Sequence, residues 1–252
     1  MPRLMDTEET MQQTGPGAFQ FSGVRVESLG ASEYTLVTIV IDRSGSVQNF
    51  AKDLLNMVKT IVEACKKSPK AENLMIRYLI FNENITEIHG FRLLKDIDLD
   101  KDYEEIEAAG LTALFDASYD AIGATIDYSA RLVDDYEFDV NGAVYIVTDG
   151  VNNRGSMTPT SIKDKIAYGV GKEKIESLVT ILVGLHDPSE MWADEVKVSL
   201  ENFHQEAELT QFIDAGDATP GKLAKLANFV SQSVSSQSQS LGSGDASQAL
   251  TF

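Results

Sequence analysis

The sequence predicts an α/β fold: a doubly wound, mainly parallel sheet with helices on both faces and one antiparallel edge strand. Three apolar runs of strand length lead to this prediction, at residues 36–41, 142–148 and 178–184. Segments with helical periodicity separate these runs along the chain. Because the runs lack the alternation of a half-exposed strand, we expect each of them to be buried on both faces of the sheet.

The first half of the chain supplies two further strands. Residues 1–32 are polar and rich in Gly and Pro, so we expect a weakly structured arm, with a short strand near residues 19–26 where apolar residues nearly alternate. A helix is expected over 47–67, since its apolar residues fall on one stripe. Residues 74–81 then form a second central strand, and a turn at 82–84 leads into the antiparallel edge strand at 85–89.

The second half continues the alternation of helix and strand. Apolar periodicity predicts helices that end near residue 133 and near residue 168, the latter opened by Pro159. After the strand at 178–184, we expect a weaker helix over 188–206, a last strand at 209–213 and a final helix over 223–234. The Ser/Gln-rich composition from Ser231 onward predicts a flexible extension, although Val234 and Leu241 are spaced to prolong the helix. We therefore expect one domain over residues 33–235, preceded by the arm and followed by a tail at 236–252.

Composition restricts the class of protein. The chain has 252 residues, 43% of them hydrophobic, and a net charge of −18, which makes nucleic acid and anionic membranes poor partners. A single cysteine, Cys65, excludes an internal disulfide and fits a reducing compartment. No apolar secretory segment opens the chain, and no apolar run approaches the ~20 residues of a membrane helix. We therefore expect a cytoplasmic protein.

Oxygen-bearing side chains follow the buried strands at the edge where parallel sheets bind ligands. Asp42, Ser44 and Ser46 come directly after the first strand, and Asp149 follows the strand at 142–148. Thr112 opens the helix between them. Carboxylate and hydroxyl oxygens suit Mg²⁺, Mn²⁺ or Ca²⁺, and two acids with neutral hydroxyls leave such an ion able to accept an outside carboxylate.

These residues resemble the metal-ion-dependent adhesion site of von Willebrand factor A (vWA) domains, which have a Rossmann-like fold. The similarity rests on Asp42-Arg-Ser44-Gly-Ser46, on Thr112 after a glycine, and on Asp149-Gly150, and it covers roughly residues 34–234. The resemblance implies that Ser44 and Ser46 bind the ion directly and that Thr112 is a switchable ligand. It also implies that Asp42 and Asp149 act through water.

Two features refine the resemblance. Arg43 stands where a small or apolar residue is commoner, and its side chain either points to solvent or leans over the ion. Residues 110–117 and 229–236 are also similar to small bacterial vWA proteins of the tellurium-resistance type. That narrower and less specific similarity implies an adaptor for ATPases, kinases or stress-response assemblies.

Other residues have more than one interpretation. Thr112 is alternatively a helix N-cap, and Asp116 either braces the loop or lies in solvent. The acidic stretch at 96–107 is either a solvated face or a docking surface for a basic partner. Cys65 is expected in the core, and Trp192 is expected to be a packing residue. The three histidines, His89, His186 and His204, lack metal-ligand spacing.

The residues favour a divalent-metal-dependent binding module whose ion captures an acidic side chain of a partner protein. An alternative is a metal-assisted hydrolase or phosphotransfer enzyme that uses the same ion, but no phosphate-binding loop, nucleophile–base pair or histidine accompanies the motif. A further alternative is a structural subunit of a larger assembly, with the arm and the tail as docking segments. We expect a protein that is not an enzyme.

Overall fold

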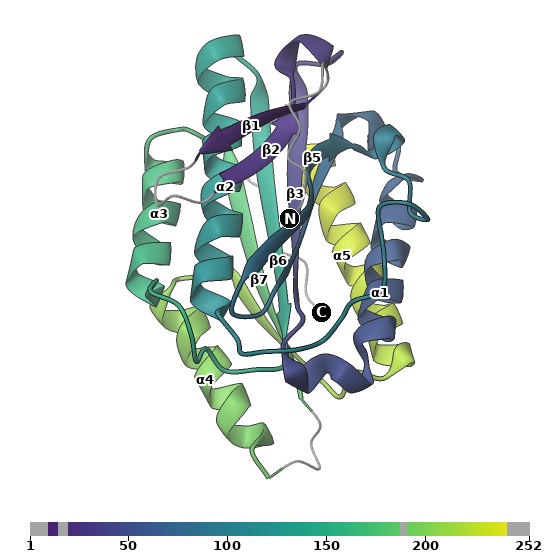
Figure 1. The fold of residues 1–252 in the computed structure, drawn as a ribbon. Helices are drawn as coiled ribbons and strands as arrows, with labels where there is room; N and C mark the ends of the chain where they lie inside the picture. Colours follow the sequence, from purple (N-terminus) through teal and green to yellow (C-terminus); the bar gives the residue numbers. More distant parts are fainter. Residues whose placement is uncertain (1–9, 15–19, 187–190, 241–252) are drawn as a thin grey trace.

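The computed structural model describes residues 10–14, 20–186 and 191–240. An eight-stranded sheet forms its centre, in the order β1-β2-β5-β4-β3-β6-β7-β8, and helices cover both faces (Figure 1). The strands are β1 (Thr10–Thr14), β2 (Gln20–Val24), β3 (Glu33–Asp42), β4 (Leu74–Phe81), β5 (Ile85–Leu93), β6 (Asp139–Thr148), β7 (Ser177–Leu185) and β8 (Gln211–Gly216). The helices are α1 (Ala51–Cys65), α2 (Leu114–Tyr136), α3 (Pro159–Gly171), α4 (Ala193–Glu206) and α5 (Pro220–Ser240). Short 3₁₀ turns are η1 (Val26–Ser28), η2 (Gly45–Asn49), η3 (Ala71–Asn73) and η4 (Leu94–Asp96).

The central strand β3 is buried on both faces, as its apolar sequence predicts. It pairs in parallel with β4 on one side and with β6 on the other, with Leu36 opposite Gly142. Val37, Ile39 and Ile41 point into the core under α1 and α5, whereas Val40 points into the core under α2, α3 and α4. Figure 1 shows these two groups of helices on opposite faces of the sheet. The doubly wound fold class is therefore confirmed.

The expected antiparallel strand is present as β5, which pairs with β4, but its expected place at the edge of the sheet is wrong. The sheet continues beyond it, because β2 pairs with β5 through Gly23 and Phe91 and β1 pairs with β2. A Cβ atom on Gly90 would lie 2.0 Å from the carbonyl oxygen of Ser22, so this close approach requires a glycine. Phe21, only 1% exposed, packs into the core here, and the expected strand near residues 19–26 is present as β2.

A buried ionic network fixes β2 to the sheet. The Arg77 side chain on β4 is wholly buried and donates to Glu87 at 2.7 Å and to Asp120 at 3.0 Å. The other oxygen of the Glu87 carboxylate accepts hydrogen bonds from the backbone and hydroxyl of Ser22. Residues 20–32, which the sequence analysis places in the arm, thus contact the folded body.

The C-terminal helix departs from its composition. The Ser/Gln-rich composition predicts a flexible extension from Ser231 onward, but α5 continues to Ser240 and packs on α1, as the alternative of a prolonged helix predicts. Val234, Gln237 and Ser238 are at most 1% exposed. The serines are buried because small side chains let the helix approach the sheet closely. The part of the predicted tail at 241–252 lies outside the described residues.

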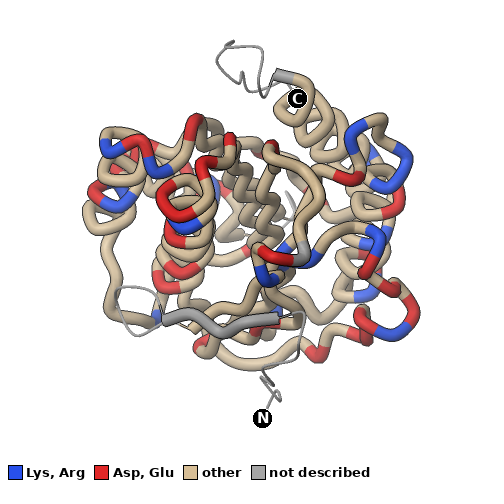
Figure 2. The backbone as a smooth tube through the Cα atoms, turned by 90° about the horizontal axis from the view of Figure 1, so that it is seen from above, with Lys and Arg blue, Asp and Glu red and all other residues tan. Residues whose placement is uncertain are grey.

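The molecule is acidic over much of its surface. Figure 2 shows Asp and Glu positions distributed along helices and loops, in keeping with 39 acidic against 21 basic residues. None of the described helices is long and apolar enough to cross a membrane.

Candidate metal centre

Asp42 is the last residue of β3, and its carboxylate is completely buried. Its Oδ1 accepts the backbone N–H of Ser44 at 2.7 Å, and its Oδ2 accepts the hydroxyl of Thr148 at 2.5 Å. Burial raises the pKa of Asp42, and the hydrogen bonds from Thr148 and Ser44 oppose that rise. Both donors are neutral, so they leave the negative charge of the carboxylate uncompensated when it is ionised.

The two serines of the same loop connect Asp42 to Asp149. The hydroxyl oxygens of Ser44 and Ser46 lie 3.1 Å apart, and the Ser46 hydroxyl donates to Asp149 at 2.7 Å. Ser44 is buried and Ser46 is exposed, so the pair leads from the interior to the surface. Ser46 begins the turn η2 with Gly45, and α1 follows. The single helix expected over 47–67 is therefore a 3₁₀ turn followed by an α-helix.

Thr112 reaches the same place from the loop before α2. Its backbone N–H donates to the side-chain oxygen of Asn153 at 2.9 Å, and its carbonyl accepts the N–H groups of Asn153 and Arg154. A Cβ on Gly150 would lie 3.2 Å from the Thr112 hydroxyl oxygen and 3.8 Å from Asp42 Oδ2. Both oxygens therefore face the space beside Gly150.

The alternative role of Thr112 as a helix N-cap is wrong. The N-cap residue of α2 is Ala113, which offers no side chain for capping. Asn152 performs that function from the loop after β6, because its side-chain oxygen accepts the N–H of Phe115 at 3.0 Å. The sequence does not identify Asn152 and Asn153 as supporting residues, because they act across 37 and 41 positions of sequence.

The turn between β4 and β5 holds the Thr112 loop in position. Asn82 donates from its side chain to the carbonyl of Ala109 at 2.8 Å, and Glu83 accepts the N–H of Leu111 at 2.7 Å. Between them, Gly110 has φ +87°, and a Cβ there would overlap the Glu83 carboxylate. These contacts lower the pKa of Glu83, first through backbone hydrogen bonds and then through the charges of Arg43 and Arg154.

Asp116 and Arg43 each had two interpretations, which the structure resolves. Asp116 braces the loop after β6, because one of its carboxylate oxygens accepts the N–H groups of Ser156 at 2.9 Å and Met157 at 2.8 Å. Arg43 is half-buried, and its guanidinium lies 3.5 Å from the Thr86 hydroxyl on β5. Arg43 therefore extends toward β5, across β4, and not over the space beside Gly150.

The histidines, Cys65 and Trp192 are not part of the candidate metal centre. His89 is buried with its ring nitrogens 2.9 Å from Tyr103 Oη and from the Gly90 carbonyl, and burial lowers its pKa to about 4. His186 lies 3.4 Å from Asp214. Cys65 is buried in the core under α1, which raises the pKa of its thiol. Trp192 is 58% exposed, so the prediction of a packing role is wrong.

The donor set fits a hard divalent cation. Two carboxylates and three hydroxyls converge, and the buried carboxylate of Asp42 has no positively charged partner among the groups that perturb its pKa. Burying such a charge is costly unless it is paired or coordinates a metal. Within the described part of the chain, no three His, Cys, Asp or Glu side chains gather as a metal site, in keeping with a set dominated by hydroxyls.

Comparison with known proteins places the fold. No family model matches the sequence, and no curated protein matches it. A D319A mutant of the PilB minor pilin from Streptococcus sanguinis is similar in structure, with a TM-score of 0.57 at 12% identity over 86% of this chain. The pilus adhesin SpaC from Lactobacillus rhamnosus GG has a TM-score of 0.57 at 8% identity over 90% of this chain.

A third similar structure is proximal thread matrix protein 1 from the mussel byssus, with a zinc-occupied MIDAS (metal-ion-dependent adhesion site) motif. It has a TM-score of 0.50 at 22% identity over 81% of this chain. The chain spans 64%, 34% and 46% of the lengths of these three proteins. At such identities the likeness concerns the fold alone, which is of the vWA, Rossmann-like type.

Proposed function

We propose that the protein is a divalent-metal-dependent protein-binding module, in which Asp42, Ser44, Ser46, Thr112 and Asp149 hold Mg²⁺, Mn²⁺ or Ca²⁺. A bound ion of this kind offers an open position to a carboxylate oxygen of a partner protein. The observation that supports the proposal best is the buried Asp42 carboxylate, whose hydrogen-bond partners are all neutral. A cation beside it would compensate this charge, and the Ser and Thr hydroxyls supply the remaining oxygens.

Each residue of the centre has a role that its contacts support. The hydroxyls of Ser44 and Ser46 are the direct ligands, since Ser46 directs its proton to Asp149 and keeps lone pairs for an ion. Thr112 is the switchable ligand, because its loop is anchored through the backbone and leaves its side chain uncommitted to capping. Asp42 and Asp149 supply the negative charge around the ion.

The solved structures support this proposal in one respect. A protein of the same fold carries a zinc-occupied MIDAS motif according to its description, and the motif residues quoted above place oxygen donors at the corresponding type of site in this chain. We propose a role in binding and not in catalysis, because no phosphate-binding loop, nucleophile–base pair or histidine accompanies the motif.

The partner rests on the resemblance alone, and the location rests on the single cysteine, which fits a reducing compartment. We propose a cytoplasmic adaptor whose partner belongs to an ATPase, kinase or stress-response complex and presents a Glu or Asp side chain. The similarity to the tellurium-resistance type motivates this part of the proposal.

The test is affinity capture from native lysate by three proteins, each in Mg²⁺ and in EDTA. They are the wild type, Ser46→Ala, and Ser156→Ala as a matched control, since Ser156 is an exposed serine in a neighbouring loop. We expect a partner that the wild type and Ser156→Ala hold in Mg²⁺ alone and that Ser46→Ala does not hold. A partner retained by all three proteins in EDTA would contradict a metal-dependent mechanism.

A further inference from the structure

The acidic stretch at 96–107 forms one wall of a crevice beside β4 and β5. The crevice has a volume of about 510 Å³ and is lined by four acidic residues of this segment, namely Asp102, Glu104, Glu105 and Glu107. Ile80, Ile88 and Ile106 supply apolar surface along it. A concave site with apolar walls and a few charged groups is typical of a binding site, so the stretch is more than a solvated face.

The crevice is lined by two cations, Arg43 and Lys101, against five acidic residues, so its net charge is negative. Lys101 pairs with Asp98 at 2.8 Å, and Arg92 pairs with Asp102 at 3.1 Å. Glu104, Glu105 and Glu107 are exposed, and none of them forms an ion pair with another described residue. Three carboxylates of like charge within four consecutive positions repel one another, and a bound cation would relieve that repulsion.

A buried hydroxyl at the crevice supports a ligand independently. Tyr78 lines it and is 1% exposed, yet its hydroxyl has no hydrogen-bond partner among the described residues. Its ring stacks on Tyr103 with centroids 5.1 Å apart, which fixes the side chain in place. Buried polar groups without partners are rare in folded proteins, and an N–H donor bound in the crevice would supply the hydroxyl oxygen of Tyr78 with a partner.

The crevice adjoins the candidate metal centre. Arg43, between Asp42 and Ser44, also lines the crevice, and its carbonyl accepts the N–H of Ala109 at 2.9 Å. In Figure 1 the chain from β5 to α2 descends beside α1 and crosses the same edge of the sheet where β3 ends. One partner segment can therefore reach both places.

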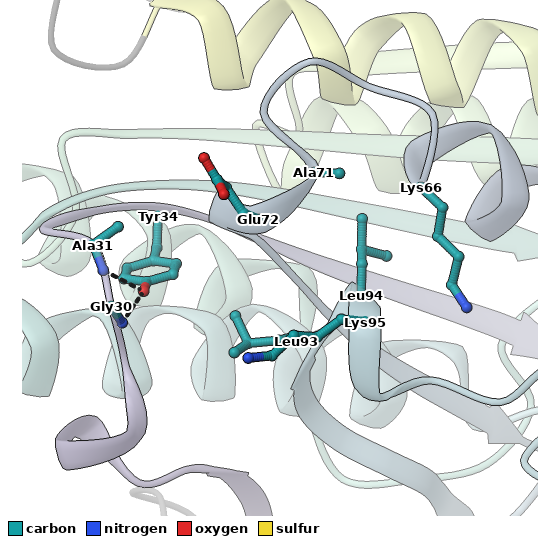
Figure 3. A pocket seen from close by; sticks show the side chains of 9 residues that line it. All are labelled: Gly30, Ala31, Tyr34, Lys66, Ala71, Glu72, Leu93, Leu94 and Lys95. Carbon is teal, nitrogen blue, oxygen red and sulfur yellow. Dashed lines mark hydrogen bonds between the residues drawn. The ribbon is translucent and has the colours of Figure 1, made fainter.

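A second cavity provides a contrast in charge. It has a volume of about 630 Å³ and is lined by Gly30, Ala31, Tyr34, Lys66, Ala71, Glu72, Leu93, Leu94 and Lys95 (Figure 3). Two lysines and one glutamate give this cavity a positive net charge, whereas the acidic crevice is negative. The Tyr34 hydroxyl there accepts the N–H groups of Gly30 at 3.1 Å and Ala31 at 3.0 Å. A cationic ligand should therefore discriminate between the two cavities.

We propose that the acidic crevice binds an arginine side chain of a partner protein. A guanidinium is planar, meets carboxylates through several N–H donors, and is more weakly hydrated than an ammonium, so it enters a partly apolar crevice at lower cost. The isoleucines accommodate its aliphatic stem. Binding of arginine here does not require a metal, whereas its placement on the same partner segment as a metal-binding carboxylate rests on the proposed function.

The first test is NMR titration of the ¹⁵N-labelled full chain in EDTA with the peptide acetyl-Gly-Arg-Gly-amide. We expect saturable shifts of amides around the crevice, such as those of Thr86 and Ile106, and none around Lys66 and Lys95. Acetyl-Gly-Glu-Gly-amide should cause neither. Equal shifts from both peptides, or shifts spread over the whole acidic surface, would overturn the proposal, while the metal-dependent function would be unaffected because EDTA removes the ion.

Matched variants test the residues. The triple variant Glu104→Gln, Glu105→Gln and Glu107→Gln should bind the arginine peptide about tenfold more weakly than the wild type. The control, Glu195→Gln, Glu201→Gln and Glu206→Gln on α4, removes the same charge from exposed positions and should leave the affinity unchanged. Tyr78→Phe should lower the affinity about threefold without lowering the melting temperature. Equal affinities in both triple variants, or tighter binding of free spermidine than of the arginine peptide, would contradict the assignment.

Discussion

Ser46 and Asp149 are 103 residues apart in sequence and joined by a hydrogen bond of 2.7 Å. This contact connects the loop after β3 to the loop after β6, two neighbouring parallel strands. Because Ser46 donates, its oxygen keeps lone pairs that point away from Asp149 and is more electron-rich than that of a free hydroxyl. The protein thus holds two members of the candidate centre in place through one contact.

Thr112→Ala should separate ion binding from carboxylate binding. The variant removes one hydroxyl and keeps the backbone contacts to Asn153 and Arg154 that hold the loop. We expect affinity for a glutamate-containing partner in Mg²⁺ to fall about tenfold, and affinity for Mn²⁺ to fall less than about threefold. Calorimetric titration of both ligands measures the difference. Equal losses would contradict the assignment of Thr112 as the switchable ligand.

Thr148→Val should weaken both the fold and the metal centre. Valine has nearly the shape of threonine but cannot donate to the buried Asp42 carboxylate, which then loses a 2.5 Å hydrogen bond. We expect the free energy of unfolding in EDTA to fall by about 1–3 kcal/mol. Urea unfolding in EDTA and in saturating Mg²⁺ checks this. Unchanged stability in EDTA would show that Thr148 does not stabilise the carboxylate.

Arg77→Met should be among the most destabilising substitutions. It leaves the buried carboxylates of Glu87 and Asp120 without their cation, and breaking a buried ion pair in this way costs about 3–5 kcal/mol. The double variant Arg77→Met, Asp120→Asn should lose less than the sum of the two single variants, by about 0.5–3 kcal/mol. Denaturant unfolding of the wild type, the two single variants and the double variant measures these losses. Strictly additive losses of unfolding free energy would show that Arg77 and Asp120 are not coupled.

His89 should make the protein less stable in mild acid. Burial lowers its pKa to about 4, below the ordinary value of 6.5, so the unfolded chain binds a proton more readily than the folded chain. The stability due to this difference is complete above pH 6.5 and is lost as the pH falls towards 4. The loss should total about 3 kcal/mol. Urea unfolding at pH 7, 6 and 5 should show that the unfolding free energy of His89→Gln depends less on pH than that of the wild type. Identical pH dependence of the two proteins would contradict the role of His89.

Most of the fold could be predicted because its central strands are unambiguous. An uninterrupted apolar sequence such as that of β3 leaves burial on both faces as the best solution, and the strand β4 has the bounds 74–81 that the sequence predicts. For helix α5 the sequence left two alternatives, a flexible extension or a prolonged helix. Its last turns are rich in serine and poor in apolar residues, and their burial depends on packing against α1 and the sheet.

The sequence predicts which residues make up the candidate centre, but not the contacts that hold them in position. Asp42, Ser44, Ser46 and Asp149 follow neighbouring parallel strands whose ends meet at one edge, so the topology brings them together. Thr112 comes from the loop before α2, which places its hydroxyl beside Gly150. Their supporting contacts depend on register and loop shape. Asn152, Asn153 and Glu83 act across 28 to 41 positions of sequence, and no local pattern specifies such partners.

The most direct test of the metal centre is titration of the full chain with Mn²⁺, followed by electron paramagnetic resonance. The wild type and the control Ser156→Ala should each bind one ion at the centre. The double variant Ser44→Ala, Ser46→Ala should bind it at least about tenfold more weakly, with an unchanged circular dichroism spectrum. Equal Mn²⁺ binding by all three proteins would show that these serines hold no metal and would contradict the account.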